Sequence, residues 1–392
     1  MFERPEHGQS VILASIDFGD PDYAEGLAEL ELLATSAGLN VAGVVEGKRG
    51  KPDAALFAGS GKADEIGDAA RAADASLVIF NNNLSSVQER NLEKRLQCRV
   101  LDRTALILEI FALRARSNEG KLQVELAQLR HYATRLVRGW THLERQKGGI
   151  GIRGGPGETQ LELDRRMILT KIKGIEVRLE KLANTRAVQR RSRQRSGVLS
   201  VSLVGYTNAG KSTLFNTLTR AGAYAADQLF ATLDTTTRKL WLPQAGQPLL
   251  LSDTVGFITR LPHALVSAFH ATLEETIHAD LLLHVVDAAS SNRERQRVEV
   301  EKVLKDIGGD QVPRIEVMNK VDLTGVEPQV ARDEYGKIAA VWLSARTGAG
   351  VDLLRDAIAE FACDLRHETQ ILAAQEAELS QSYVETNLDG LE

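Results

Sequence analysis

Nine residues near the middle of the chain restrict its fold more than any other stretch. They follow the apolar run 198–204 and precede a helical pattern in which Leu214 and Leu218 are the apolar positions. The nine residues are Gly205, Tyr206, Thr207, Asn208, Ala209, Gly210, Lys211, Ser212 and Thr213. A glycine-rich loop between a strand and a helix lets backbone N–H groups surround phosphates, while the lysine reaches the β- and γ-phosphates. Ser212 would bind Mg²⁺, and the helix N-terminus favours negative charge. A glycine-rich turn without a ligand is the alternative, but the lysine, the hydroxyl and both flanks favour a phosphate-binding loop.

Three later elements each follow an apolar, strand-like run and would complete the site. The first comprises Asp253, Thr254, Val255 and Gly256; the second, Asn319, Lys320, Val321 and Asp322; the third, Ser344, Ala345 and Arg346. Asp253 would hold Mg²⁺ through a water, and the N–H of Gly256 would contact the γ-phosphate. Alone, this D-x-x-G tetrad is a weak signal. The carboxylate of Asp322 would accept hydrogen bonds from guanine N1 and N2, which adenine cannot donate, and buried polar matching of this kind rejects the wrong base strongly. The order of the elements predicts a guanine-nucleotide site.

The segment between the first two elements is rich in threonine and includes Phe230, Ala231 and Thr232. A nucleotide switch needs one threonine that closes on Mg²⁺ and the γ-phosphate and is released after hydrolysis. We assign this role to Thr232, although Thr235, Thr236 and Thr237 remain alternatives. The predicted magnesium ligands are therefore Ser212, Thr232 and Asp253, and the predicted catalytic groups are Lys211, Thr232 and Gly256.

Phe257 follows Gly256, at the place where Ras-like enzymes carry a glutamine that orients the attacking water. A phenyl ring can neither transfer protons nor position water. We therefore expect slow intrinsic turnover that a partner stimulates.

Composition limits the class of protein and its surroundings. A chain of 392 residues is long enough for two or three domains. Its two cysteines, Cys98 and Cys363, lack metal-ligand spacing, which is typical of a reducing cytoplasm. The first residues do not form a signal peptide, and no apolar run approaches 18 residues, so we expect a cytoplasmic protein without a membrane span. We also expect a monomer.

Charge is distributed unevenly along the chain. Residues 114–195 carry 20 Lys/Arg and 8 Asp/Glu, a net charge of +12; the whole chain carries −5, so the remainder carries −17. A basic segment between acidic flanks indicates an anionic polymer as partner, with nucleic acid ahead of membrane.

The fold class that we expect is α/β, with an N-terminal α/β domain, an antiparallel helical hairpin and a P-loop GTPase domain whose sheet is mostly parallel. The predicted boundaries are 1–113, 114–197, 198–364 and, for a short C-terminal extension, 365–392. Strand patterns in the first domain cover 10–16, 41–45, 54–58 and 77–80, and helical patterns cover 22–37, 61–74, 85–96 and 104–113. The turn at Gly59–Lys62 resembles a phosphate turn, but a simple helix start is favoured. His284, inside an apolar run, is expected to be a packed core residue.

Two heptad seams predict the hairpin. The first seam is Leu122, Leu126, Leu129, Ala133, Leu136, Trp140 and Leu143, and the second is Ile168, Ile172, Ile175, Leu179 and Leu182. The joint 147–157 holds six glycines and a proline, so it would form an exposed tip, where Arg145, Lys147 and Arg153 supply charge. Arg186, Arg190, Arg191, Arg193 and Arg195 are interpreted as phosphate contacts. A solvated coiled coil with a flexible loop is the alternative; the coincidence of the glycine-rich tip with the +12 charge favours RNA binding.

Several of these motifs together resemble the HflX family of ribosome-associated GTPases. The resemblance rests on Gly148–Leu161 (GGIGIRGGPGETQL), on Asp164, Arg165 and Arg166, and on the run from Gly205 through Asp322, and it covers nearly the whole chain. It implies binding to the large (50S) ribosomal subunit, with the N-terminal domain and hairpin on ribosomal RNA and the tip directed to the peptidyl-transferase centre. It also implies the splitting of stalled ribosomes under stress and GTP hydrolysis stimulated by that subunit. The chain departs from the family pattern in two places. It has Asp234, Thr235 and Thr236 where many members have Asp-Pro-Thr. Many members also carry a further small C-terminal domain, for which at most some 29 residues remain here.

Two functions follow from these observations. The first is a ribosome-stimulated GTPase whose nucleotide state drives subunit binding and release. The second is an RNA- or ribosome-binding factor in which GTP acts only as an occupancy signal. A third, an RNA-modifying GTPase, ranks low because the sequence supplies neither a cofactor site nor a catalytic cysteine arrangement.

Overall fold

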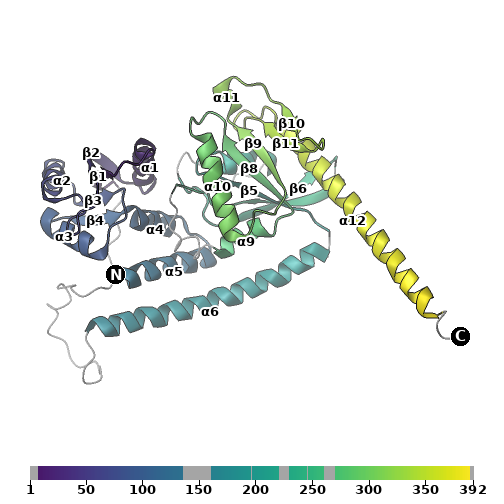
Figure 1. The fold of residues 1–392 in the computed structure, drawn as a ribbon, viewed down its shortest axis with the longest axis horizontal. Coiled ribbons are helices and arrows are strands. Elements are labelled where there is room, and N and C mark those ends of the chain that lie inside the picture. Colours follow the sequence, from purple (N-terminus) through teal and green to yellow (C-terminus); the bar gives the residue numbers. More distant parts are fainter. Residues whose placement is uncertain are drawn as a thin grey trace. The chain divides into compact units, whose positions relative to one another are not determined.

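The computed structural model describes residues 8–135, 160–195, 197–219, 229–244, 246–259 and 270–388. By its internal contacts the chain divides into two compact units, each with its own sheet (Figure 1). The first unit comprises Met1–Arg191, Tyr224–Thr235 and Thr254–Glu274. The second comprises Ser192–Ala223, Thr236–Asp253 and Glu275–Glu392. Two segments from the predicted nucleotide site therefore make most of their contacts in the first unit.

The first unit begins with a four-stranded parallel sheet in the order β2-β1-β3-β4. The strands are β1 (Ser10–Asp17), β2 (Asn40–Lys48), β3 (Leu77–Phe80) and β4 (Arg99–Asp102). Four helices connect or follow them: α1 (Tyr23–Ser36), α2 (Ser60–Ala72), α3 (Ser86–Leu96) and α4 (Arg103–Arg114). Helices α1 and α4 lie on one face of the sheet, and α2 and α3 lie on the other (Figure 1). This confirms the α/β fold with a parallel sheet.

One predicted strand of this sheet is wrong, and one strand was not predicted. Residues 54–58 form a turn with a single bridge between Asp53 and Phe57. The carboxylate of Asp53 accepts hydrogen bonds from the N–H groups of Ala55 and Leu56, and Phe57 has a φ of 58°, so the backbone turns before it can extend. Strand β4 was missed because it has only four residues, of which two, Val100 and Leu101, are apolar.

Helices α5 (Asn118–Arg135) and α6 (Gln160–Arg195) form the described part of the predicted hairpin. Leu126, Ile172 and Ile175 make a buried cluster against which Leu122, Leu129, Ala133, Ile168 and Leu179 pack. Glu119 pairs with Arg186, and Arg130, further along α5, pairs with Glu176, which comes earlier in α6. The two helices are therefore antiparallel. The seam residues Leu136, Trp140 and Leu143 and the tip at 147–157 lie outside the described residues.

The second unit contains a seven-stranded sheet in the order β10-β11-β9-β8-β5-β7-β6. Its strands are β5 (Ser200–Gly205), β6 (Thr236–Leu242), β7 (Gln247–Asp253), β8 (Leu281–Asp287), β9 (Arg314–Asn319), β10 (Val330–Arg332) and β11 (Ile338–Trp342). The two edge strands are antiparallel to their neighbours and the five central strands are parallel. The carboxyl ends of β5, β7, β8 and β9 therefore meet at one edge, where ligands bind in such sheets.

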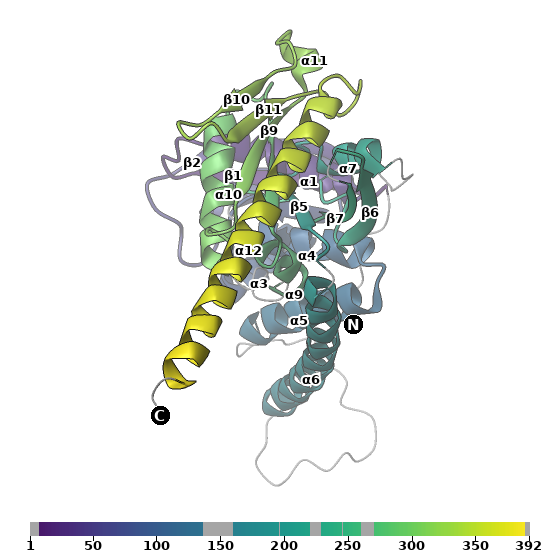
Figure 2. The same cartoon turned by 90° about the vertical axis from the view of Figure 1, so that its right-hand side faces the viewer.

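Helices α7 (Lys211–Thr219), α9 (His270–Ile277), α10 (Arg293–Ile307), α11 (Val321–Thr324) and α12 (Val351–Leu388) complete the described elements. The main core of the second unit joins α7 and α12 to the sheet, and α10 lies on the side of the sheet opposite α12 (Figures 1 and 2). Helix α12 continues through residue 364, so the expected boundary between the last GTPase helix and a C-terminal extension does not interrupt the helix. His284 is 1% exposed in β8, which confirms its place in the core.

Candidate nucleotide-binding site

The predicted phosphate loop joins β5 to α7, with Gly205 as the last residue of the strand and Lys211 as the first of the helix. Gly205 has a φ of +147°, and a Cβ there would lie 2.2 Å from the carbonyl oxygen of Val285. Gly210 has a φ of +97°, and a Cβ there would lie 2.1 Å from Nδ2 of Asn319. Both positions therefore require glycine, because a side chain would be strained by the backbone conformation and would also collide. The motif glycines set the curvature of the loop.

Two polar side chains are buried within this loop. Lys211 is 6% exposed, and its ammonium donates hydrogen bonds to the carbonyl oxygens of Gly205 (3.1 Å) and Tyr206 (2.8 Å). Burial lowers the pKa of Lys211 to about 8, against the opposing attraction of Asp253. Thr207 is 6% exposed, and among the described residues its hydroxyl has no hydrogen-bond partner. A cation and a hydroxyl held in this way fit an anionic ligand that carries several oxygen atoms.

Ser212 and Asp253 meet at the start of α7. The Ser212 hydroxyl donates to Oδ2 of Asp253 at 2.7 Å, and Asp253, the last residue of β7, is 2% exposed. Adjacent hydroxyl and carboxylate oxygens are the hard donors that Mg²⁺ prefers, and Mg²⁺ is commonly held by one or two such groups together with phosphate oxygens. In the described part of the chain, no group of three or more His, Cys, Asp or Glu side chains could hold a metal ion. The pair therefore fits a magnesium ion that binds together with a nucleotide.

The base-recognition segments lie at the ends of β9 and β11 and are joined to the phosphate loop by Asn319. Its Nδ2 donates to the carbonyl oxygen of Ala209, and its Oδ1 accepts from the N–H of Ala345, both at 2.8 Å. Ser344 and Ala345 are buried, whereas Arg346 and Asp322 are exposed. An exposed carboxylate at the first turn of α11 is free to meet a base edge, so the assignment of Asp322 stays a prediction.

Sequence reasoning missed two supporting side chains. The Thr217 hydroxyl donates to the carbonyl oxygen of Ala345 at 2.8 Å, so α7 also supports the base segment. Asp287, at the end of β8, forms an ion pair with Lys320 at 2.8 Å. The position of Asp287 at a strand end, immediately after the apolar run 281–286, could have identified it.

The two predicted switch segments belong to the first unit. Thr232 is half-buried between the buried residues Phe230 and Leu233, and Gly256 lies between the buried residues Val255 and Phe257. Thr236 and Thr237 are in β6, where the Thr237 hydroxyl is hydrogen-bonded to that of Ser252 at 2.9 Å. A threonine fixed in a sheet is less suited to switching than one in a loop, which favours Thr232 or Thr235 over Thr236 and Thr237. The role of Thr232 as a magnesium ligand and that of Gly256 as a phosphate contact stay predictions.

Comparison with known proteins identifies the family. Residues 24–112, 114–193 and 200–320 match families described as GTP-binding GTPase N-terminal, GTP-binding GTPase Middle Region and 50S ribosome-binding GTPase. The GTPase HflX of Escherichia coli K12 is 53% identical over 385 residues, which cover 98% of this chain and 90% of that protein. The GTPase HflX of Caldanaerobacter subterraneus is 47% identical over 95% of this chain and 84% of that protein.

The chain belongs to the GTPase HflX family. Its enzymatic activity is accordingly the hydrolysis of GTP, which agrees with the P-loop fold. Among solved structures, the complex of SsGBP with GDP aligns with a TM-score of 0.52 at 24% identity, over 91% of this chain and 99% of that one. That similarity supports the fold alone.

In this HflX-family chain, two of the arginines expected to contact RNA form ion pairs within the protein. Arg186 forms an ion pair with Glu119, and Arg190 pairs with Glu274 at 3.0 Å. Both arginine side chains are largely buried, at 22% and 15% exposure. Both arginines therefore join α5, α6 and α9 through ion pairs, and their expected phosphate contacts stay a prediction. The charged tip residues Arg145, Lys147 and Arg153 lie outside the described residues.

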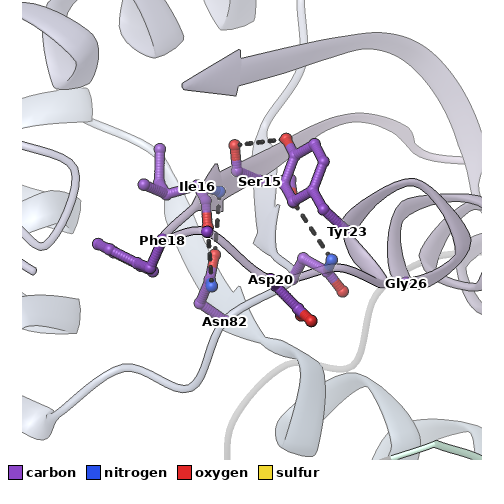
Figure 3. Close-up of a pocket in the computed structure, with 9 residues that line it drawn as sticks. Ser15, Ile16, Phe18, Asp20, Tyr23, Gly26 and Asn82 are labelled. Carbon is purple, nitrogen blue, oxygen red and sulfur yellow. Dashed lines mark hydrogen bonds between the residues drawn. The ribbon is translucent and has the colours of Figure 1, made fainter. Parts of the chain in front are cut away.

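The N-terminal sheet has a cavity of about 320 Å³ at the carboxyl ends of β1 and β3 (Figure 3). The strand order shows that the connections from these two strands leave in opposite directions. Tyr23 and Asp20 line the cavity, and the amide of Asn82 is hydrogen-bonded to the N–H and carbonyl groups of Ile16. Burial, reinforced by Glu46 and Asp17, raises the pKa of Tyr23 to about 12. The lining residues include a carboxylate but no lysine or arginine. The lining is thus polar, with one carboxylate, Asp20, and the amides of Asn81 and Asn82.

The Gly59–Lys62 turn is a helix start. Gly59 precedes α2 with a φ of +83°, and the ammonium of Lys62 pairs with Glu65 at 2.6 Å. The favoured interpretation of this turn is confirmed. Within the described ranges, no helix combines the length and apolar character needed to cross a membrane.

Proposed function

We propose that this HflX-family GTPase binds the large (50S) ribosomal subunit and that its nucleotide state controls binding and release, which splits or rescues stalled ribosomes. The observation that carries the proposal is the match of residues 200–320 to a family described as 50S ribosome-binding GTPase. The net charge of +12 over residues 114–195 supports an RNA-rich partner, because phosphate neutralisation dominates such binding. A monomer in the reducing cytoplasm fits this partner and the two free cysteines.

In the proposed mechanism, the loop N–H groups and Lys211 bind the β- and γ-phosphates, and Asp322 selects guanine. Ser212, Thr232 and Asp253 would hold Mg²⁺, which supplies charge stabilisation to the phosphates when bound. In the protein without nucleotide, burial of the Lys211 side chain lowers its pKa. The negative charge of bound phosphates would keep this lysine protonated. The chain thus supplies binding, orientation and a cation.

Phe257 supports the dependence of hydrolysis on the subunit. Its side chain is 1% exposed, so the residue that follows Gly256 is packed in protein. Neither its chemistry nor its position suits it to orient a water molecule. We infer that the ribosomal subunit supplies or arranges the group that positions water, and that turnover without the subunit is slow.

Sedimentation with purified 50S subunits tests the proposal. The protein is incubated with GTP, GDP or a non-hydrolysable GTP analogue, and bound protein and released phosphate are measured in parallel. We expect strong binding with the analogue, weaker binding with GDP, and phosphate release that rises with added subunits. Nucleotide-dependent binding without stimulated phosphate release would instead support the occupancy-signal alternative, and an absence of binding in all states would refute both.

The contribution of the tip is tested by replacing Arg145, Lys147 and Arg153 with glutamine. The slope of log binding constant against log salt should fall in magnitude by about 2 to 3, since each lost phosphate contact removes somewhat less than one unit. Basal hydrolysis should not change. A matched control replaces the exposed residues Lys239, Lys302 and Lys305 of the second unit with glutamine and should leave the slope unchanged.

A further inference from the structure

The loop that carries Thr232 ends in a carboxylate at the N-terminus of α5. Oδ2 of Asp234 accepts hydrogen bonds from the N–H groups of Arg116 (2.7 Å) and Ser117 (2.8 Å). Its Oδ1 accepts from the Ser117 hydroxyl at 2.6 Å. The Ser117 oxygen in turn accepts from the N–H of Gly120 at 2.8 Å. Backbone N–H groups at a helix start have no partners within the helix. Here Ser117, immediately before α5, accepts from the N–H of Gly120, and Asp234, more than a hundred residues away, accepts from the two N–H groups that precede the helix.

The local sequence permits this close approach. A Cβ on Gly120 would lie 2.0 Å from Oδ1 of Asp234, so any other residue at 120 would displace the carboxylate. The N-terminus of a helix also carries a partial positive charge, which favours a carboxylate. Steric fit, hydrogen bonding and charge thus all place Asp234 at this helix end.

Apolar contacts hold the same loop on the first unit. The rings of Phe230 and Phe111 meet edge to face, with centroids 4.6 Å apart, and Phe230 is 2% exposed. The N–H of Leu229 donates to the Ser36 hydroxyl at 3.0 Å. Thr232 lies between these anchors and Asp234, so its position depends on both.

The helix end that Asp234 caps is also the base of the hairpin. Glu119, in the first turn of α5, pairs with Arg186 of α6. Burial raises the pKa of Glu119, Arg186 opposes that shift, and Glu274 and Asp234 reinforce it. Loss or movement of the Asp234 carboxylate would therefore change the electrostatics at the point where α5 and α6 are joined.

We propose that Asp234 is a nucleotide-dependent cap of α5, which links the nucleotide state to the base of the hairpin. The proposal rests on the proposed function in one respect, the assignment of Thr232 as the threonine that engages Mg²⁺ and the γ-phosphate. Two residues span at most about 7 Å, so Thr232 cannot move far without displacing Asp234. The hydrogen bonds of Asp234 to the start of α5 then differ in strength between the GTP and GDP states. Because such coupling is reciprocal, these hydrogen bonds also change the relative affinity of the protein for the two nucleotides.

Amide hydrogen exchange at Arg116 and Ser117 tests this inference on the free protein. Exchange is measured with GDP and with a non-hydrolysable GTP analogue, in the wild type and in Asp234→Ala. We expect the wild-type protection of these amides to differ by about tenfold between the two nucleotides, a coupling of ordinary size. The difference should disappear in Asp234→Ala. Equal protection in both wild-type states, or an undiminished difference in the variant, would overturn the proposal.

Two further variants separate a specific effect from damage to the fold. Asp333→Ala removes a carboxylate that accepts two backbone N–H groups in the second unit, from Tyr335 and Lys337, and should leave the exchange difference intact. Ser117→Ala removes one of the three hydrogen bonds to Asp234, together with the acceptor of the Gly120 N–H, and should reduce the difference without abolishing it. The ratio of GDP to analogue affinity should shift in Asp234→Ala and stay at the wild-type value in Asp333→Ala. Because no ribosomal subunit is present, failure of subunit binding would not affect these results.

Discussion

Asn319 in β9 donates a hydrogen bond from Nδ2 to the carbonyl oxygen of Ala209, 2.8 Å away in the phosphate loop. The oxygen of the same amide accepts from the N–H of Ala345, also at 2.8 Å. Asn319 is 2% exposed, so both hydrogen bonds are shielded from water. One side chain therefore fixes the spacing between the segments predicted to hold the phosphates and the base.

Asn319→Ala should lower both stability and nucleotide affinity. The substitution leaves the Ala209 oxygen and the Ala345 N–H without their side-chain partner, which costs about 1–3 kcal/mol for a buried group. Denaturant unfolding and GDP titration measure the two effects. Asn319→Asp keeps an acceptor for Ala345 but loses the donor to Ala209, so its defect should differ from that of Asn319→Ala. Wild-type values for both variants would contradict the bridging role.

Gly210→Ala should abolish tight nucleotide binding or prevent folding. The new Cβ would lie 2.1 Å from Asn319 Nδ2, at a backbone φ of +97° that L side chains rarely adopt. Gly174→Ala provides a matched control, because nothing lies within 4 Å of a Cβ at that position in α6. Alanine in place of an exposed helical glycine should stabilise the protein by about 0.5–1 kcal/mol. Thermal unfolding should therefore shift in opposite directions for the two variants.

GDP binding at pH 8.5 should take up a proton at Lys211. In the free protein the pKa of Lys211 is about 8, so above that pH the side chain is largely neutral. The phosphates stabilise the charged form and raise the pKa, so affinity should fall as the pH rises through 8 and beyond. Calorimetry in buffers of different ionisation enthalpy counts the protons. At pH 6.5, where the lysine is already charged, its contribution should vanish; equal uptake at both pH values would exclude Lys211 as the source.

His284 should make the protein sensitive to acid. Burial, with help from Arg297, Arg314 and Lys211, lowers its pKa to about 4. Between pH 6.5 and 4 the unfolded chain binds a proton that the folded chain does not, so stability falls as the pH is lowered through this range. The shift corresponds to about 3 kcal/mol. Unfolding free energies of His284→Gln should lack this part of the pH dependence, and an identical dependence in both proteins would exclude it.

Phe257→Gln should not create an efficient GTPase. The Phe257 ring is among the largest fully buried side chains, so glutamine would leave a cavity and bury an amide. We expect a loss of about 3–5 kcal/mol of stability, as for other large-to-small core changes. Single-turnover hydrolysis without ribosomal subunits should remain slow. A stable variant with fast intrinsic hydrolysis would show that residue 257 reaches the site and that only its chemistry limits the rate.

Much of the fold could be read from the sequence because periodicity and glycine placement act locally. The apolar run 77–80 is β3, and the motif glycines at 205 and 210 occupy the positive-φ positions that the loop requires. The heptad residues near 126 and 172 meet because helical spacing alone puts them on one face. The predicted strand at 54–58 failed because the Asp53 carboxylate offered the backbone a competing turn.

By itself, the sequence determined the family, the P-loop fold and the order of the nucleotide motifs, since each depends on residues that are neighbours in the chain. Only the tertiary structure decided how distant groups are used. In the tertiary structure Phe257 is buried, Arg186 and Arg190 form ion pairs, and Asp234 lies at the N-terminus of α5. These outcomes depend on hydrogen bonds and charges between segments far apart in the chain, and no local pattern records such pairings.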